Sequence, residues 1–163
     1  MGLQNLVSNR CYDFDVYQGI SAGKRQISEF GMAADVVLKL CSTLPSHQNH
    51  KVYADNFFTG VTLLQKLVER GIHFVGTVRS ERLPNCTLQD EKELKKKGRG
   101  SFDWKIEQES NIIAVQWCDT RAVILLSTYV GASPVDQVRR SNKGQKEYVS
   151  IERPCSVCVT NPS

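Results

Sequence analysis

Residues 51–78 read KVYADNFFTGVTLLQKLVERGIHFVGTV, and this stretch decides the fold. Lys51–Ala54 is typical of a short strand that runs into Asp55, and Ile72–Val78 is typical of a second strand. Between them Thr59 could cap a helix that Gly71 would end. The apolar residues of one face of that helix would be Val61, Leu64, Leu67 and Val68. A strand, a helix and a strand in succession predict an α/β layered domain.

The preceding residues extend this pattern. Met32–Leu44 has apolar residues at helical spacing, and Pro45 ends it. Ser46–His50 is polar and predicts a connection. Cys11–Gly19 predicts a strand closed by a turn, followed by a loop to Gly31. Helices are therefore expected to cover a mixed sheet.

The composition changes after Arg79. Glu81–Gly100 is polar and charged, and strand-like runs return at Ile112–Trp117 and Ala122–Tyr129. Asp119–Arg121 fits a hairpin turn between those two strands, and Glu147–Ile151 predicts one more strand. Trp104 and Trp117 are expected to be strand residues that pack this region, and Arg139–Gly144 is basic and polar.

The overall composition limits the possible classes. The chain has 163 residues, 40% of them hydrophobic, and 21 basic against 17 acidic side chains give a formal charge of +4. These values fit one domain, or one domain with an inserted module, and permit binding to nucleic acid without requiring it. No apolar run approaches the roughly 20 residues of a membrane helix, and the first residues do not read as a signal peptide. An intracellular protein with no membrane association is expected.

The six cysteines are scattered, which favours a reducing compartment. Only Cys155 and Cys158 have the spacing of metal ligands, and structural zinc needs four ligands. The three histidines have no partnered nucleophile, so a hydrolase triad and a small-molecule substrate are not expected.

The stretch from Tyr53 to Gly60, YADNFFTG, followed by a helix and then by Gly76-Thr77-Val78-Arg79, resembles the piggyBac transposase family and its domesticated descendants. The resemblance continues upstream in YDFDVYQG at 12–19, and downstream in Trp117-Cys118-Asp119 and in LLST at 125–128. It covers the chain from about Cys11 to Pro154.

The resemblance implies a partial RNase H-like mixed sheet flanked by helices, with an inserted β-rich subdomain. It divides the chain into a transposase core at 1–80, a β-rich insertion at 81–150 and a truncated tail at 151–163. The activity that it implies is DDE/D transposition of DNA, in which three carboxylates hold two Mg²⁺ or Mn²⁺ ions for phosphoryl transfer.

Asp55 matches the second of the family's three aspartates, which makes it the expected catalytic and metal-ligating remnant. The first would fall near Asn5, where the sequence no longer resembles the family, and the third belongs to a motif that would follow Pro154. Asp13 and Asp15 match other family positions and are expected to be structural. A protein that has lost catalysis and its metal ions is therefore the leading hypothesis.

Phe57 and Phe58 are expected in the core, and Asp55 taken alone could simply hydrogen-bond its turn.

Two alternatives remain open. The chain could be a domesticated module that binds DNA or full-length piggyBac relatives, with a nuclear location. It could also be a weak metal-dependent nuclease in which Asp55 acts with Asp13 or Asp15. The candidate DNA-binding residues are basic side chains of the region that resembles the insertion, which a solvated loop would explain equally: Lys95, Lys96, Lys97, Arg99, Arg139 and Arg140.

Overall fold

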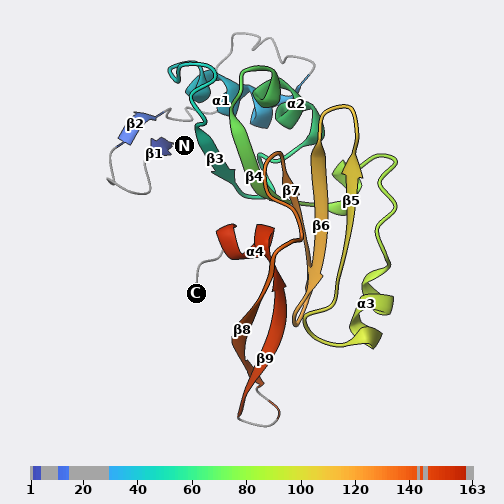
Figure 1. Ribbon diagram of the computed structural model, residues 1–163. Coiled ribbons are helices and arrows are strands. Elements are labelled where there is room, and N and C mark those ends of the chain that lie inside the picture. The colour runs from blue at the N-terminus through green and yellow to red at the C-terminus, as the bar shows by residue number, and fades with distance from the viewer. Residues whose placement is uncertain (1, 5–10, 15–29, 143, 145–146, 161–163) are drawn as a thin grey trace, which may run out of the picture.

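The computed structural model describes residues 30–142, 144 and 147–160 in full and the backbone of residues 2–4 and 11–14. Its centre is a five-stranded sheet with the order β3-β4-β7-β6-β5 (Figure 1). The strands of this sheet are β3 (Lys51–Ala54), β4 (His73–Val78), β5 (Phe102–Glu107), β6 (Ile112–Cys118) and β7 (Ala122–Ser127). β3 and β4 run parallel, with Lys51 opposite His73, and the other neighbouring pairs are antiparallel. The predicted mixed α/β fold is confirmed.

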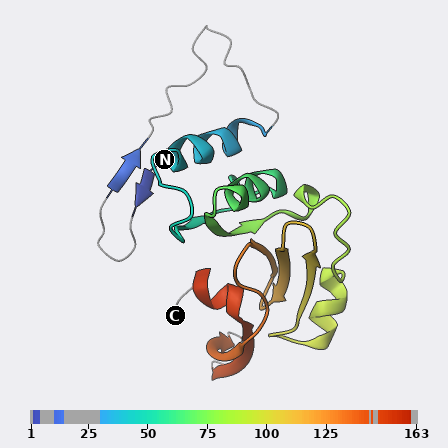
Figure 2. The same ribbon diagram turned by 45° about the horizontal axis from the view of Figure 1, so that its top comes forward.

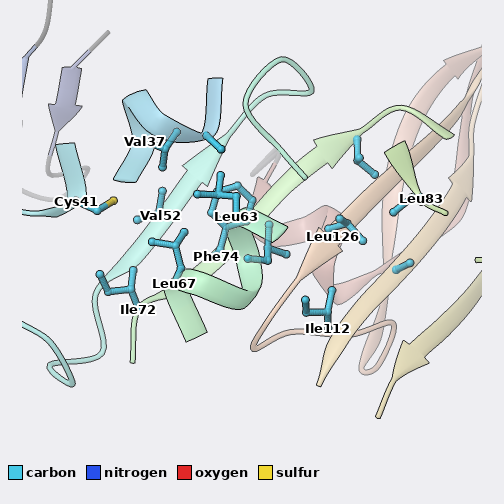
Figure 3. Close-up of a cluster of buried hydrophobic side chains, with 14 residues drawn as sticks. Val37, Cys41, Val52, Leu63, Leu67, Ile72, Phe74, Leu83, Ile112 and Leu126 are labelled. Atoms are coloured by element: carbon cyan, nitrogen blue, oxygen red, sulfur yellow. The ribbon is translucent and has the colours of Figure 1, made fainter. Parts of the chain in front are cut away.

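Two helices cover one face of the sheet, α1 (Met32–Cys41) and α2 (Val61–Glu69) (Figures 1 and 2). α2 joins the two parallel strands, as a crossover between parallel strands requires. Figure 3 shows the apolar side chains of both helices meeting those of the sheet. The buried residues of this cluster include Val37, Cys41, Val52, Leu63, Leu67, Phe74 and Leu126. Their burial is what holds the helices on the sheet.

The opposite face of the sheet is covered by a hairpin of β8 (Val135–Asn142) and β9 (Glu147–Pro154), together with α4 (Cys155–Thr160). Val138 and Ile151 of the hairpin, Val157 of α4 and Val75 and Trp117 of the sheet form a second buried cluster. The hairpin continues beyond this cluster and projects from the body of the molecule (Figure 1).

The remaining elements are short. β1 (Gly2–Gln4) and β2 (Cys11–Phe14) form an antiparallel pair, so the first part of the predicted strand at Cys11–Gly19 is present. The rest of that strand, the predicted loop to Gly31 up to residue 29, and Asp15 lie outside the described residues. A single 3-10 turn, η1 (Ser80–Arg82), follows β4, and α3 (Glu91–Lys97) precedes β5. None of the described helices is long and apolar enough to cross a membrane.

Most predicted elements between residues 32 and 129 are confirmed within a few residues, and the turn at Asp119–Arg121 is closed by a hydrogen bond from the Asp119 N–H to the Arg121 carbonyl. Several elements were not predicted, namely β1, η1, α3, β8 and α4, and β5 was anticipated only through Trp104 as a strand residue. The polar segment before Gly100 contains α3, and the basic segment at Arg139–Gly144 belongs largely to β8. Neither has the continuous apolar periodicity by which a helix or strand is predicted. The sheet includes strands from both sides of residue 80, and the division into a core and an insertion stays a prediction.

Four predicted side-chain roles are wrong. Thr59 does not cap α2, because the N-cap residue is Gly60 and the Thr59 hydroxyl donates to the Asp55 carbonyl instead. Val68 is exposed, since the buried face of α2 passes through Leu63 rather than Val68. Phe57 is about half exposed and is not a core residue, and Trp104 lies in a strand as predicted but is also half exposed rather than packed. Phe58 does pack against the first cluster, and Trp117 is buried in the second as predicted.

Candidate DNA-binding surface and the Asp55 turn

Asp55 lies in a tight turn at the end of β3. Its carboxylate Oδ1 accepts a hydrogen bond of 3.0 Å from the N–H of Phe57. Its carbonyl accepts bonds from the Phe58 N–H, the Thr59 N–H and, at 2.8 Å, the Thr59 hydroxyl. An aspartate that bonds the backbone two residues ahead forms an Asx turn, which is a structural role available to any Asp here. The Asp55 side chain is otherwise exposed.

The turn is held from two sides. Arg82, at the end of η1, donates through Nη1 to the carbonyls of Asn56, Phe57 and Thr59 at 2.9, 2.8 and 3.3 Å. On the other side Gly76 of β4 approaches so closely that a Cβ there would lie 2.5 Å from the Thr59 hydroxyl. Asp55 therefore has a fixed position at the carboxyl ends of the parallel strands.

The described residues do not fit a two-metal centre. A pair of metal ions needs several acidic oxygens that converge from separate elements. In the part of the chain whose side chains are described, no group of three or more His, Cys, Asp or Glu residues could hold a metal ion, either around Asp55 or around Cys155 and Cys158. Asp13 lies in β2 opposite Leu3, and its side chain, like all of Asp15, is outside the description. The arrangement of the described residues therefore supports no metal-dependent reaction.

A cavity of about 770 Å³ lies beside the Asp55 turn, on the face of the sheet that carries α1 and α2. Asn56 of the turn, Val78 of β4 and Gln116 of β6 contribute to its wall, and Gln116 is buried. The charged residues of its lining are Arg79, Glu81, Asp90 and Glu91. The acidic side chains outnumber the basic one, so the electrostatics of this cavity do not favour the phosphates of a nucleic acid.

Three of the four lysines of α3, Lys95, Lys96 and Lys97, form an exposed cationic patch at the end of that helix. Lys95 pairs with Glu91 at 2.7 Å, and Lys97 donates to the Gln89 side chain at 2.6 Å. Lys96 has no ion-pair partner among the described residues. An ion pair between exposed side chains contributes little free energy, so Lys95 can exchange Glu91 for another anion at small cost.

Arg99 and Arg140 are not part of the exposed patch, because they share Asp119. Arg99 contacts the Asp119 carboxylate through Nε at 2.7 Å and Nη2 at 2.5 Å, and the Arg140 Nε lies 3.8 Å from the other oxygen. Arg99 also donates to the Ser141 carbonyl of β8 at 3.3 Å. The side chains of these three charged residues are all about a quarter exposed or less. They join the turn between β6 and β7 to the hairpin and the end of α3.

Arg139, the neighbour of Arg140, faces the other way. Its guanidinium lies 5.5 Å from the centre of the Tyr148 ring, and both residues are exposed. Alternation along β8 explains the difference, since successive side chains of a strand point to opposite faces. Charge alone groups the two arginines together, and the opposite directions of their side chains follow only from β8, which was not predicted. Tyr148 and Asp119 were also missed as site residues, and only the apolar alternation of Val149 and Ile151 in β9 could have indicated which way Tyr148 points.

Comparison with known proteins agrees with the resemblance in the sequence. Residues 3–156 match the family model described as Transposase IS4. The human protein called PiggyBac transposable element-derived protein 3 is 34% identical over 151 residues, which are 91% of this chain and 25% of that protein. Human PiggyBac transposable element-derived protein 2 is 38% identical over 114 residues, 70% of this chain and 19% of that protein. This chain thus spans about a quarter or less of the length of these relatives.

One solved structure is also similar, the cryo-EM structure of a piggyBac transposase synaptic complex with hairpin DNA. The TM-score is 0.46 and the identity 20%, over 71% of this chain and 23% of that chain. The family model matches nearly the whole chain, and the chain belongs to the piggyBac-type Transposase IS4 family.

Proposed function

We propose that this chain binds duplex DNA and does not cut it. The observation that carries the proposal is the position of the basic side chains: the lysines of α3 and Arg139 of β8 are exposed, and Figure 1 shows α3 and the β8–β9 hairpin at the same end of the molecule, away from α1 and α2. Membership of a transposase family supports DNA as the partner. Access to chromosomal DNA would require a nuclear location.

The expected contact is with phosphates, in a manner independent of sequence. A protein that neutralises three or four phosphates releases the counterions of those phosphates, so the logarithm of the binding constant should fall with the logarithm of salt concentration with a slope of about −2.7 to −3.6. Between 50 and 200 mM salt this slope corresponds to an affinity loss of about 40- to 150-fold. The four exposed lysines of α3, Lys92, Lys95, Lys96 and Lys97, supply that number of cations.

The absence of cutting rests on the geometry of Asp55. Its carboxylate accepts a bond from the Phe57 N–H, and among the residues described it belongs to no group of three or more His, Cys, Asp or Glu side chains that could hold a metal ion. One carboxylate cannot bring two metal ions to a scissile phosphate.

DNA binding is tested with the full chain and a fluorescein-labelled 20-bp duplex, with anisotropy recorded from 50 to 200 mM NaCl. A triple variant, Lys95→Gln with Lys96→Gln and Lys97→Gln, should bind more weakly and show a slope smaller in magnitude by about two to three. The control removes the same charge elsewhere, through Lys39→Gln, Lys66→Gln and Lys105→Gln. An equal loss in both variants would refute the α3 patch as the binding site.

Cutting is tested with supercoiled plasmid in Mg²⁺ or Mn²⁺. Nicking should not exceed the protein-free background, and it should be the same for wild type and for Asp55→Asn. The asparagine keeps an oxygen for the Phe57 N–H, so the turn should persist. Nicking that disappears in Asp55→Asn would overturn this part of the proposal and favour the nuclease alternative.

A further inference from the structure

The β8–β9 hairpin has one exposed and mostly polar face, which we call the outer face. The register pairs Arg139 with Ser150 and Ser141 with Tyr148, and directly opposed residues of an antiparallel pair share a face. The inner face carries the buried Val138 and Ile151. The outer face, apart from the strand ends at Val135 and Pro154, consists of Gln137, Arg139, Ser141, Tyr148, Ser150 and Glu152, all of them exposed.

The hairpin is fixed to the body through its inner face and its backbone. The Trp117 indole N–H donates to the Glu152 carbonyl at 2.8 Å. Gly100 approaches β9 so closely that a Cβ there would lie 2.8 Å from the Glu152 nitrogen. At the base of the hairpin, Arg153 makes a two-pronged ion pair with Asp136 at 3.0 and 2.7 Å. These contacts leave the outer face uncovered by any described residue while giving it a defined direction.

The chemistry of the outer face suits the edges of base pairs. Arginine, glutamine and serine are side chains that hydrogen-bond bases in the major groove, and that groove is wide enough, at about 12 Å, for a two-stranded β-ribbon. Arg139 is held over the Tyr148 ring at 5.5 Å, and the Ser150 hydroxyl donates to the Gln137 side chain at 2.9 Å. A protein partner is less well matched, because the large exposed apolar side chains of this face are only two, Val135 and Tyr148, and they lie near its opposite ends.

We infer that the outer face of β8–β9 enters the major groove of duplex DNA, where Arg139 contacts base edges while the α3 lysines contact phosphates. This inference rests on the proposed DNA binding. Arg99 supports it, since its bond to the Ser141 carbonyl ties the segment after α3 to the last residues of β8. Tyr148 is a positioning residue: its ring holds the Arg139 guanidinium by a cation–π contact.

The test combines chemical interference with variants of the full chain. Duplexes lightly methylated with dimethyl sulfate carry modified guanine N7 in the major groove and modified adenine N3 in the minor groove. Bound and unbound duplexes are separated on a native gel and cleaved. N7 methylation should be depleted from the bound fraction, and N3 methylation should not.

Among the variants, Arg139→Gln and Tyr148→Leu should each weaken binding about tenfold, and Tyr148→Phe should bind like wild type because it keeps the ring. Tyr148→Leu removes no charge, so it should lower affinity without changing the salt slope, unlike Lys96→Gln. Far-UV circular dichroism should show an unchanged thermal midpoint for each.

A failure of the groove contact can be distinguished from a failure of DNA binding itself. A wild-type chain that binds the duplex without N7 interference overturns the groove contact and leaves the phosphate binding intact. Equal affinity of Tyr148→Leu and wild type overturns it as well. A wild-type chain that does not bind the duplex at 50 mM salt overturns both this inference and the proposed function. The interference result needs no variant, so it decides the matter even if a substitution unfolds the hairpin.

Discussion

Gly76→Ala tests how tightly β4 packs against the Asp55 turn. A Cβ at this position would lie 2.5 Å from the Thr59 hydroxyl, 2.6 Å from the Ala54 carbonyl and 3.0 Å from the Phe74 ring. The Thr59 side chain cannot turn away freely, because it is fully buried and donates to the Asp55 carbonyl. The Ala54 carbonyl belongs to the backbone of β3, which pairs with β4. The backbone of β3 or β4 must therefore shift to make room for the added methyl group.

Overpacking by one methyl group in such a site costs about 1–3 kcal/mol of the free energy of unfolding. A loss of 2 kcal/mol would lower the thermal midpoint of a chain of this size by about 4–8 °C. The measurement is thermal and urea unfolding followed by far-UV circular dichroism and by the fluorescence of the buried Trp117. The unfolding midpoint of Gly76→Ala should fall by the same amount with both probes if the unfolding is two-state.

Gly60→Ala is the matched control. No atom lies within 4 Å of a Cβ at Gly60, and its φ of −163° is accessible to any residue. Its free energy of unfolding should change by no more than about 0.5 kcal/mol. Equal midpoints for Gly76→Ala and Gly60→Ala would refute the close contact between β4 and the Asp55 turn.

Three further predictions concern stability and reactivity. Arg82→Ala removes three hydrogen bonds to carbonyls of the Asp55 turn and should lower the free energy of unfolding by about 1–3 kcal/mol in urea titrations; no change would show that solvent replaces the guanidinium. The bonds from Arg153 hold the pKa of Asp136 below its usual value, so the stabilisation is present above the unfolded-state pKa and is lost as pH falls through the folded-state pKa. Wild type should therefore lose more stability than Asp136→Asn when the pH is lowered from 6 to below about 4, and parallel curves would contradict this. Burial raises the pKa of Cys41 to about 11, so iodoacetamide at pH 8 should modify this thiol only after unfolding, as read by peptide mass mapping; rapid labelling of the folded chain would show that the α1 contact opens.

The elements between residues 32 and 78 were predictable because their local patterns agree with their tertiary surroundings. The helical spacing of Val37 and Leu40 corresponds to a buried face of α1, and Gly71 has the positive φ of 65° that ends α2. Phe57 was misjudged because an aromatic residue beside a strand is usually buried, whereas the turn held by Arg82 leaves it about half exposed. The pattern of the sequence does not show which way the Phe57 side chain points.

The basic residues show the same limit of prediction from sequence. Lys95, Lys96 and Lys97 are exposed as a charged run suggests, although they belong to a helix rather than to a loop. Arg99 and Arg140 were grouped with them by charge alone. Their common contact with Asp119 joins residues 20 and 21 positions apart, and no periodicity in a single sequence indicates such a contact.

The sequence by itself determined the family, the parallel strand–helix–strand unit at 51–78 and the place of Asp55 at the end of a strand, because these depend on local motifs and on the period of apolar residues. Only the tertiary structure decided which basic side chains are available to a partner. Arg139 and Arg140 are neighbours with the same charge, yet the pairing of β8 with β9 exposes one and turns the other toward Asp119. That choice depends on strand register and on contacts between distant segments, which are properties of the packed chain.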